Sequence, residues 1–129
     1  MPKLAANLSL LFTEHDFLDR FAAAAEAGFR GVEFLFPYDW PAADIAERLA
    51  EHGLSQVLFN LPPGDFEAGE RGFGAVPGRE ADFREGLELA LDYAEVLRCP
   101  HLHVMAGKIP EGADLAEMQS TFVANLHLA

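Results

Sequence analysis

Apolar residues follow two different spacings along this chain, and the two spacings alternate. Short runs rich in apolar residues, at 3–10, 31–36, 55–61 and 101–106, predict β-strands. The run at 31–36 is nearly all apolar, as expected of a strand covered on both faces. Between and after these runs, at 13–28, 42–52, 80–98 and 114–129, apolar residues recur at helical spacing and predict helices. Strands and helices that alternate in this way predict parallel strands joined by right-handed crossovers.

The predicted helices have recognisable ends, except for the last. Thr13 followed by Asp16 resembles a capping box, and Gly28 and Gly53 are residues that typically end a helix. The final segment has no Gly, Asn or Pro after Leu126, although the last carbonyls of a helix need partners. We therefore expect the chain to stop partway through a larger repeating pattern. The apolar face of this final helix would consist of Leu115, Met118, Phe122 and Leu126.

The alternation leaves two architectures open. One is an open doubly wound sheet, and the other is half of a (β/α)₈ barrel. The longest connections, at 37–41, 62–78 and 107–113, all follow predicted strands. Because both architectures build their active sites at that end of the strands, we expect any pocket at the C-terminal ends of the strands and not at the opposite rim.

Composition narrows the range of functions. The 129 residues are 50% hydrophobic, which excludes a disordered chain, and the 21 acidic and 9 basic residues give a formal charge of −12. This charge would repel a phosphate backbone, so we expect no nucleic-acid partner. No apolar run approaches the ~20 residues that span a bilayer, so we expect no membrane partner. Cys99 is the only cysteine, which rules out an internal disulfide and suggests a reducing, cytoplasmic setting.

Five stretches, in order along the chain, resemble one enzyme family. They read NLSLLF at 7–12, GFRGVEFLFPYDW at 28–40, NLPPGDFEAGERG at 60–72, PGREADFREG at 77–86 and HVMAGKIPEG at 103–112. Together they resemble the hydroxypyruvate isomerase family within the xylose isomerase-like TIM barrels, over essentially the whole chain. The resemblance implies an α/β fold in which residues 1–129 form the first four βα units of a TIM barrel, with parallel strands in the order 1-2-3-4 and the C-terminal half absent.

The resemblance also implies an activity. The family moves a carbonyl between adjacent carbons, converting hydroxypyruvate to tartronate semialdehyde, and related members act on 2-oxo-tetronates through an enediolate. Two glutamates transfer the protons, often with a divalent metal, Mg or Mn, in the full-length fold. These glutamates would lie beyond Ala129, so we expect this chain to bind no cofactor and to be inactive alone. Its small-molecule partner would be a hydroxy-oxo acid.

Three basic residues follow predicted strands and are candidates for binding an acidic substrate. Lys108, just after the fourth predicted strand, could pair with the substrate carboxylate or be an ordinary surface lysine. Arg71 could bind the same carboxylate with two hydrogen bonds. Arg79 precedes a helix, and for this residue we expect a local ion pair with Glu80 or Asp82.

Polar residues inside or near the strands are further candidates. Glu33 is a charged residue in an otherwise apolar strand and therefore needs a partner. We expect it to be a hydrogen-bonding residue of the barrel interior, with contact to substrate or metal as the alternative. It is also the one candidate base within this chain. Asn7 and Asn60 would either orient substrate hydroxyls or bond to local backbone.

His101 and His103 are two residues apart on a predicted strand and so share a face. A pair of histidines lacks the third ligand that a metal site needs, so we expect no metal here. His103 lies deeper in the strand and is a candidate for substrate binding, whereas His101 would lie at the rim.

Three functions fit these observations. The first is an isomerase sequence of which this chain is the N-terminal half. The second is a non-catalytic half-barrel that forms homo-oligomers, binds a partner or aggregates through its open strand edges. The third is a small open-sheet binding protein unrelated to the family.

Overall fold

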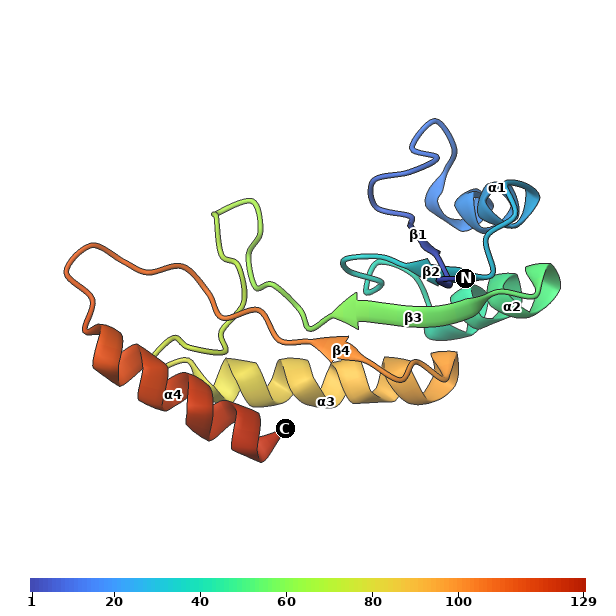
Figure 1. The fold of residues 1–129 in the computed structure, drawn as a ribbon. Coiled ribbons are helices and arrows are strands. Elements are labelled where there is room, and N and C mark those ends of the chain that lie inside the picture. Colours follow the sequence, from blue (N-terminus) through green and yellow to red (C-terminus); the bar gives the residue numbers. More distant parts are fainter. The chain divides into compact units, whose positions relative to one another are not determined.

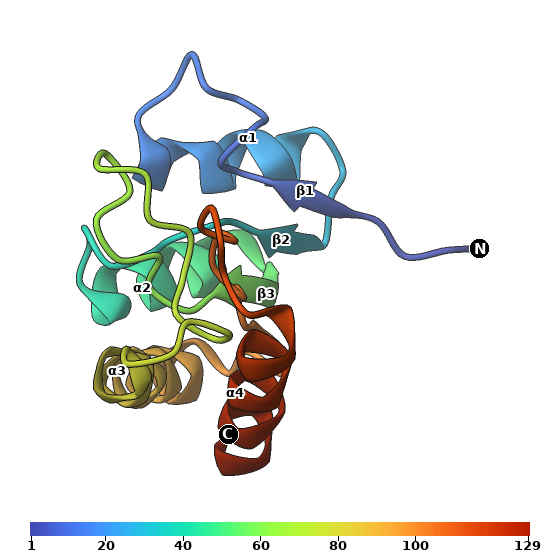
Figure 2. The ribbon, with the colours of Figure 1, turned by 90° about the vertical axis from the view of Figure 1, so that its left-hand side faces the viewer.

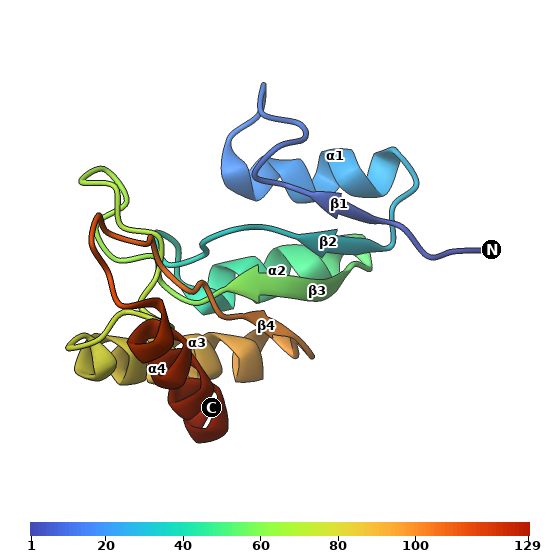
Figure 3. The ribbon, with the colours of Figure 1, turned by 60° about the vertical axis from the view of Figure 1, so that its left-hand side comes forward.

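The computed structural model describes residues 1–129, and the chain divides into two compact units. Unit 1 comprises Met1–Phe59 and Asp92–Leu102, and unit 2 comprises Asn60–Leu91 and His103–Ala129. The strands are β1 (Ala5–Asn7), β2 (Gly31–Glu33), β3 (Ser55–Asn60) and β4 (Leu102–His103). They form one sheet in the order β1-β2-β3-β4, with β1–β2 and β2–β3 parallel, which confirms the predicted strand order. Figure 3 shows β1, β2 and β3 following one another.

The strands are shorter than their apolar runs predicted. Leu8 and Phe34 lie just past the ends of β1 and β2, yet they are 0% and 2% exposed. Apolar character therefore continues into the turns after the strands, because those turns also contribute to the core of unit 1. The hydrogen bonds between strands end before the buried residues do. The apolar pattern of a sequence marks the buried residues, so it predicts strands that are too long.

The register between β2 and β3 shifts by one residue. Glu33 pairs with Leu58, so Val57 is an extra residue in β3. Because side chains alternate along a strand, this extra residue changes which positions of β3 point to each face. Phe59 is therefore fully buried, and its ring stacks on that of Phe34 with centroids 6.2 Å apart.

Aromatic rings form the core of unit 1, where the short helix η1 (Phe17–Asp19) leads into α1 (Arg20–Glu26). Phe17 packs edge-to-face against Phe21 and Phe34, at 5.5 and 5.3 Å, and stacks on Trp40 at 4.1 Å. The predicted capping box is wrong, because Asp16 makes no side-chain hydrogen bond to the helix start. Packing of these rings, in place of a cap, fixes the helix that Figure 1 labels α1.

Helix α2 (Ala42–His52) has the predicted bounds. Ile45 and Leu49 are buried, and Gly53 ends the helix in the left-handed conformation, as expected. Its position beside α1 in unit 1 is visible in Figure 2.

Helix α3 (Glu80–Leu97) contributes residues to both units. In unit 1, the hydroxyl of Tyr93 donates to the carbonyl of Trp40 at 2.8 Å, and its ring packs against Tyr38. Burial, with the neighbouring Tyr93, raises the pKa of the Tyr38 hydroxyl well above its ordinary value. Arg98, with φ at 51°, then reverses the chain so that the amide of Cys99 donates to Ala94.

Unit 2 contains the long loop 61–79, which leaves the end of β3 in Figure 1, and helix α4 (Leu115–Leu128). Asp114 caps α4 by accepting from the amides of the next turn. The predicted apolar face of α4 is only partly correct. Met118 is buried, but Leu115 and Leu126 are 60% and 47% exposed. Asn125 is buried in their place, because its side-chain amide donates to the carbonyl of Gly74 at 2.9 Å.

None of the helices combines the length and the apolar character that a membrane crossing requires.

Candidate functional site

In unit 1, the C-terminal ends of β1 and β2 are joined by side-chain hydrogen bonds. Asn7 donates its Nδ2 to Glu33 Oε1 at 3.1 Å and accepts the amide of Ser9 at 3.0 Å. The hydroxyl of Ser9 in turn accepts the amide of Leu35 at 2.9 Å. Asn7 therefore bonds both local backbone and a charged side chain of the neighbouring strand. The prediction that Glu33 needs a hydrogen-bonding partner is confirmed, and its other carboxylate oxygen has no protein donor.

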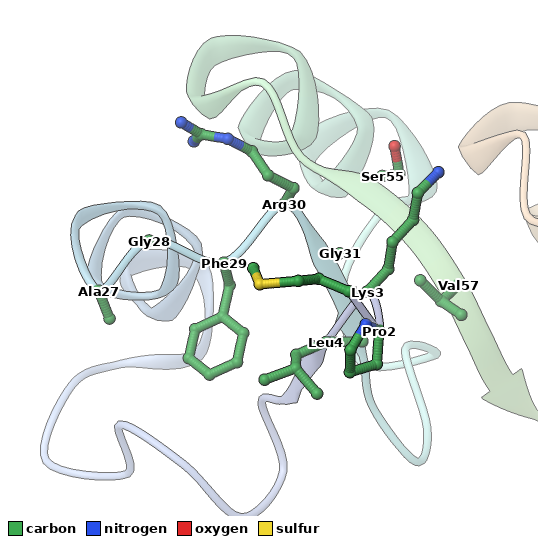
Figure 4. A pocket seen from close by; sticks show the side chains of 12 residues that line it. Pro2, Lys3, Leu4, Ala27, Gly28, Phe29, Arg30, Gly31, Ser55 and Val57 are labelled. Atoms are coloured by element: carbon green, nitrogen blue, oxygen red, sulfur yellow. The ribbon is translucent and has the colours of Figure 1, made fainter.

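A hollow of unit 1 lies at the opposite end of the strands, contrary to the expected position. It has a volume of about 820 Å³ and is formed by the N-terminal segment, the turn before β2 and the start of β3 (Figure 4). Leu4, Phe29 and Val57 are among the side chains around it. Its two basic side chains, Lys3 and Arg30, point away from each other in Figure 4. Because the walls are largely apolar and gather no set of polar groups, this hollow lacks the features of a catalytic site.

In unit 2, Asn60 and His103 form a pair at the ends of β3 and β4. Asn60 Oδ1 lies 3.1 Å from His103 Nδ1, and Asn60 Nδ2 donates to the sulfur of Met105 at 3.7 Å. Because Oδ1 can only accept, neutral His103 carries its proton on Nδ1 and leaves the Nε2 lone pair for another donor. The ring of His101 lies instead against the carbonyl of Val57, at 3.2 Å, within unit 1.

The residues do not form a metal site. No three His, Cys, Asp or Glu side chains lie close enough together to hold an ion. A divalent metal of the kind the family resemblance implies would therefore have to find its ligands elsewhere, and no chemical step on these residues is assigned to it.

The long loop of unit 2 is closed by its own backbone. The amide of Gly72 donates to Pro63 at 2.7 Å, and the amide of Glu70 donates to Asp65 at 2.9 Å. The loop is also tied to the segment after β4, because the amide of Gly74 donates to the carbonyl of Met105 at 3.0 Å. These bonds fix the loop against the strand ends that carry Asn60 and His103.

Arg71 is held by the backbone of this loop. Its Nη1 donates to the carbonyls of Phe66 and Glu70, at 3.0 and 2.6 Å, and its guanidinium lies 3.6 Å from the centre of the Phe66 ring. The Nε and Nη2 groups of Arg71 have no protein acceptor. A carboxylate could therefore bind these two groups together.

Arg79 has acceptors on both sides, which confirms the predicted local ion pair. Its Nε donates to Asp82, and its Nη1 donates to Glu70 Oε1 at 2.7 Å. Glu70 Oε2 also accepts the amide of Asp65 at 2.6 Å. The hydrogen bond from Arg79, with that from the Asp65 amide, lowers the pKa of the Glu70 carboxyl. Glu70 is therefore ionised at neutral pH.

A cavity of about 270 Å³ lies between this loop and the segment after β4. Its walls consist of Ala68, Gly69, Glu70, Arg71, Gly72, Phe73, Val76, Arg79 and Lys108. The Lys108 ammonium lies over Gly69, only 3.1 Å from where a Cβ would stand, and makes no ion pair. The orange-to-red segment that carries Lys108 lies beside the green loop in Figures 2 and 3. The structure thus brings the predicted binding residues Arg71 and Lys108 to one cavity.

Gly72 should be the least replaceable residue of this loop. With φ at 91°, a Cβ there would stand 2.4 Å from Met105 Cβ and 2.5 Å from the Met105 carbonyl. Gly78 has a similar φ of 82° but open space around it. We expect Gly78→Ala to cost about 1–2 kcal/mol of unfolding free energy, from backbone strain alone. Gly72→Ala should cost about 2–5 kcal/mol in urea unfolding, because a clash is added. Equal losses would contradict the described loop closure.

Sequence reasoning missed the contribution of Glu70 and Gly69. Glu70 is the only acidic residue between Ala68 and Arg79, and it lies among glycines and two arginines. The position of Glu70 as a lone acid beside two arginines was the indication in the sequence that it forms an ion pair within the loop. The role of Gly69, which makes room for Lys108, could not be found from sequence because it depends on a contact between distant segments.

Comparison with known proteins identifies the family. A family model described as a xylose isomerase-like TIM barrel matches residues 21–129. The chain is 57% identical to a 2-oxo-tetronate isomerase of Cupriavidus necator and 46% identical to a hydroxypyruvate isomerase of Escherichia coli. Each match covers 100% of this chain and 50% of the relative, so the chain spans about half the length of these curated relatives.

A solved structure agrees with these matches. It is described as an AP endonuclease, family 2, from Brucella melitensis, and is 57% identical with a TM-score of 0.94 over 97% of this chain and 48% of that chain. The predicted resemblance to hydroxypyruvate isomerases is confirmed by the curated relatives, and four strands in the order β1-β2-β3-β4 correspond to half of a barrel. The chain belongs to the xylose isomerase-like TIM barrel family.

Proposed function

We propose that this chain is the substrate-binding half of an isomerase that acts on a small 2-oxo acid with a hydroxyl on the neighbouring carbon. Hydroxypyruvate and 2-oxo-tetronate are the substrates named for its relatives. The observation that carries the proposal is the pair of cations, Arg71 and Lys108, without carboxylate partners in one small cavity. In a chain with a formal charge of −12, two basic side chains left unpaired together favour an acidic ligand.

The cavity suits a carboxylate in particular. The guanidinium of Arg71 has two adjacent donor groups available, which match the two oxygens of a carboxylate, and Lys108 adds a point charge. Asn60 and His103 lie on the strand ends to which this loop is tied, and we assign them to the hydroxyl and oxo groups of the substrate. His103 Nε2 can accept a hydrogen bond from a substrate hydroxyl, because its Nδ1 is the atom that bonds Asn60.

Proton transfer between the two reacting carbons of the substrate needs a pair of carboxylates. Residues 1–129 do not provide such a pair. Glu33 is the only acidic residue in the strands, and Asn7 holds one of its oxygens. We therefore assign the main proton transfers to sequence that corresponds to the second half of the relatives. Asn7 and Glu33 then have a hydrogen-bonding role within unit 1.

DNA processing, which the name of the Brucella protein suggests, is the less suitable function for this chain. A backbone of phosphates would meet 21 acidic and 9 basic residues. The two uncompensated cations, Arg71 and Lys108, line a cavity of about 270 Å³, which suits a small acid better than a duplex.

Removing the charge of Lys108 should weaken substrate binding. We expect Lys108→Ala to raise the dissociation constant for hydroxypyruvate about tenfold or more, because charged hydrogen bonds contribute about 1.5–3 kcal/mol. Isothermal titration with the purified protein measures this change.

Lys3→Ala is the matched control, since it removes the same charge from the N-terminal segment of unit 1. It should leave the dissociation constant unchanged. If the protein fails to bind hydroxypyruvate and 2-oxo-tetronate, or if both variants weaken binding equally, the assignment of substrate and site is wrong.

A further inference from the structure

The cavity that we assign to the substrate carboxylate contains a negative charge in its wall. Glu70 lines it together with Arg71, Arg79 and Lys108. Arg79 is neutralised by Glu70 and by Asp82, which lies outside this wall. The uncompensated cations are therefore Arg71 and Lys108, and the five charges sum to +1.

The position of the Glu70 carboxylate is fixed by two hydrogen bonds. The amide of Asp65 holds Oε2 at 2.6 Å, and Arg79 holds Oε1 at 2.7 Å. Gly64 leaves room for this arrangement, because a Cβ there would stand 2.2 Å from Oε2. The carboxylate cannot turn away from the cavity without losing both hydrogen bonds. An anion that binds in the cavity is therefore repelled by the negative charge of Glu70.

We propose that Glu70 determines specificity at this site by admitting singly charged carboxylates and rejecting phosphate dianions. The inference rests on the proposed carboxylate site and adds the residue that discriminates a carboxylate from a phosphate ester. A carboxylate balances the net charge of +1 and can bind the open edge of Arg71. A phosphate dianion brings one more charge than the site can balance and places it near Glu70.

Repulsion between Glu70 and a phosphate dianion would lower the affinity of the site for the wrong ligand. Glu70 serves two purposes at once, because it also occupies the Arg79 donor that would otherwise bind a phosphate oxygen. Neutralising Glu70 should therefore remove the repulsion and release a cation. Neutralising Asp82 should release only Arg79 Nε and leave Glu70 in place, which makes Asp82→Asn the matched control.

The test compares two three-carbon ligands, glycerate and glycerol 3-phosphate, by titration of the protein at pH 8. We expect the wild-type protein to bind glycerate about tenfold more tightly than glycerol 3-phosphate, which corresponds to one unfavourable charge contact near a protein surface. Glu70→Gln should bring the two dissociation constants together. Asp82→Asn changes the net charge equally but keeps the Glu70 carboxylate in the wall, so it should shift their ratio clearly less.

A second measurement needs only the wild-type protein. Because the second pKa of a phosphate ester is about 6, glycerol 3-phosphate is mainly a monoanion at pH 5 and mainly a dianion at pH 8. It should therefore bind more tightly at pH 5 than at pH 8, relative to glycerate.

The outcomes separate this inference from the proposed function. If glycerate does not bind, or binds independently of Lys108, the carboxylate site itself is wrong. If glycerate binding depends on Lys108 but Glu70→Gln leaves the ratio unchanged, the site stands and the role of Glu70 is refuted. Should Glu70→Gln fail to fold, an unchanged ratio between pH 5 and pH 8 in the wild-type protein refutes the role of Glu70 equally.

Discussion

A polypeptide of these 129 residues alone is expected to show no hydroxypyruvate isomerase activity. We expect activity to appear when the second half of a relative is supplied. Each positioned proton-transfer group contributes about 10²–10⁴-fold to a rate, and the enediolate reaction needs two. Glu33 is the only carboxylate carried by a strand here. Co-expression with the other half of the Cupriavidus necator relative, which is 57% identical over the part that matches, should provide the missing groups.

The product can be followed by NMR in D₂O, where tartronate semialdehyde formed through an enediolate acquires solvent deuterium. The chain alone and the second half alone serve as controls. An active 129-residue chain would overturn the division of roles that we propose, and loss of that activity in Glu33→Gln would then identify Glu33 as the base. A folded, co-purifying pair that converts neither hydroxypyruvate nor 2-oxo-tetronate would overturn the proposed function.

Truncating Phe34 is expected to be the most destabilising of the single substitutions considered. The Phe34 side chain is 2% exposed, and the centroid of its ring lies 5.3 to 6.2 Å from those of Phe17, Phe21 and Phe59. Phe34→Ala should lower the free energy of unfolding by about 3–5 kcal/mol, because it leaves a cavity in addition to the lost burial. Urea denaturation followed by circular dichroism measures the change.

Phe66→Ala is the matched control, because the same atoms are removed from a side chain that is 43% exposed. Its cost should be about 1–2 kcal/mol, below that of Phe34→Ala, because much of this side chain is already in water and fewer contacts are lost. Similar losses at the two positions would show that the aromatic cluster does not stabilise unit 1 as described.

The elements that the sequence predicted best are those whose determinants are local. Helix α2 was predicted with its correct bounds because Ile45, Leu49 and Gly53 lie within one repeating pattern. The strand ends were predicted less well, since pairing depends on a partner strand that is remote in sequence. The shift at Val57 shows why: nothing local to β3 requires an extra residue, and only the register against β2 reveals it.

The candidate site followed the same rule. The pattern indicated that Glu33 needs a partner, but Asn7 could be chosen only once β1 and β2 were seen side by side. Lys108 and Arg71 were predicted separately, and their common cavity depends on a contact between two loops. Asn125 was overlooked because a buried asparagine on α4 makes sense only with the carbonyl of Gly74 in view.

The division of the chain into units has a consequence for its synthesis. Unit 1 includes Asp92–Leu102 as well as Met1–Phe59, so neither unit is one continuous stretch of sequence. A ribosome that adds about 5–20 residues per second releases the aromatic core of unit 1 several seconds before the segment that completes it. During that interval Tyr93 has not yet reached Trp40, and the core around Phe17 has an incomplete cover. The nascent chain would therefore be most exposed to misfolding and to chaperones while residues 60–91 are being made.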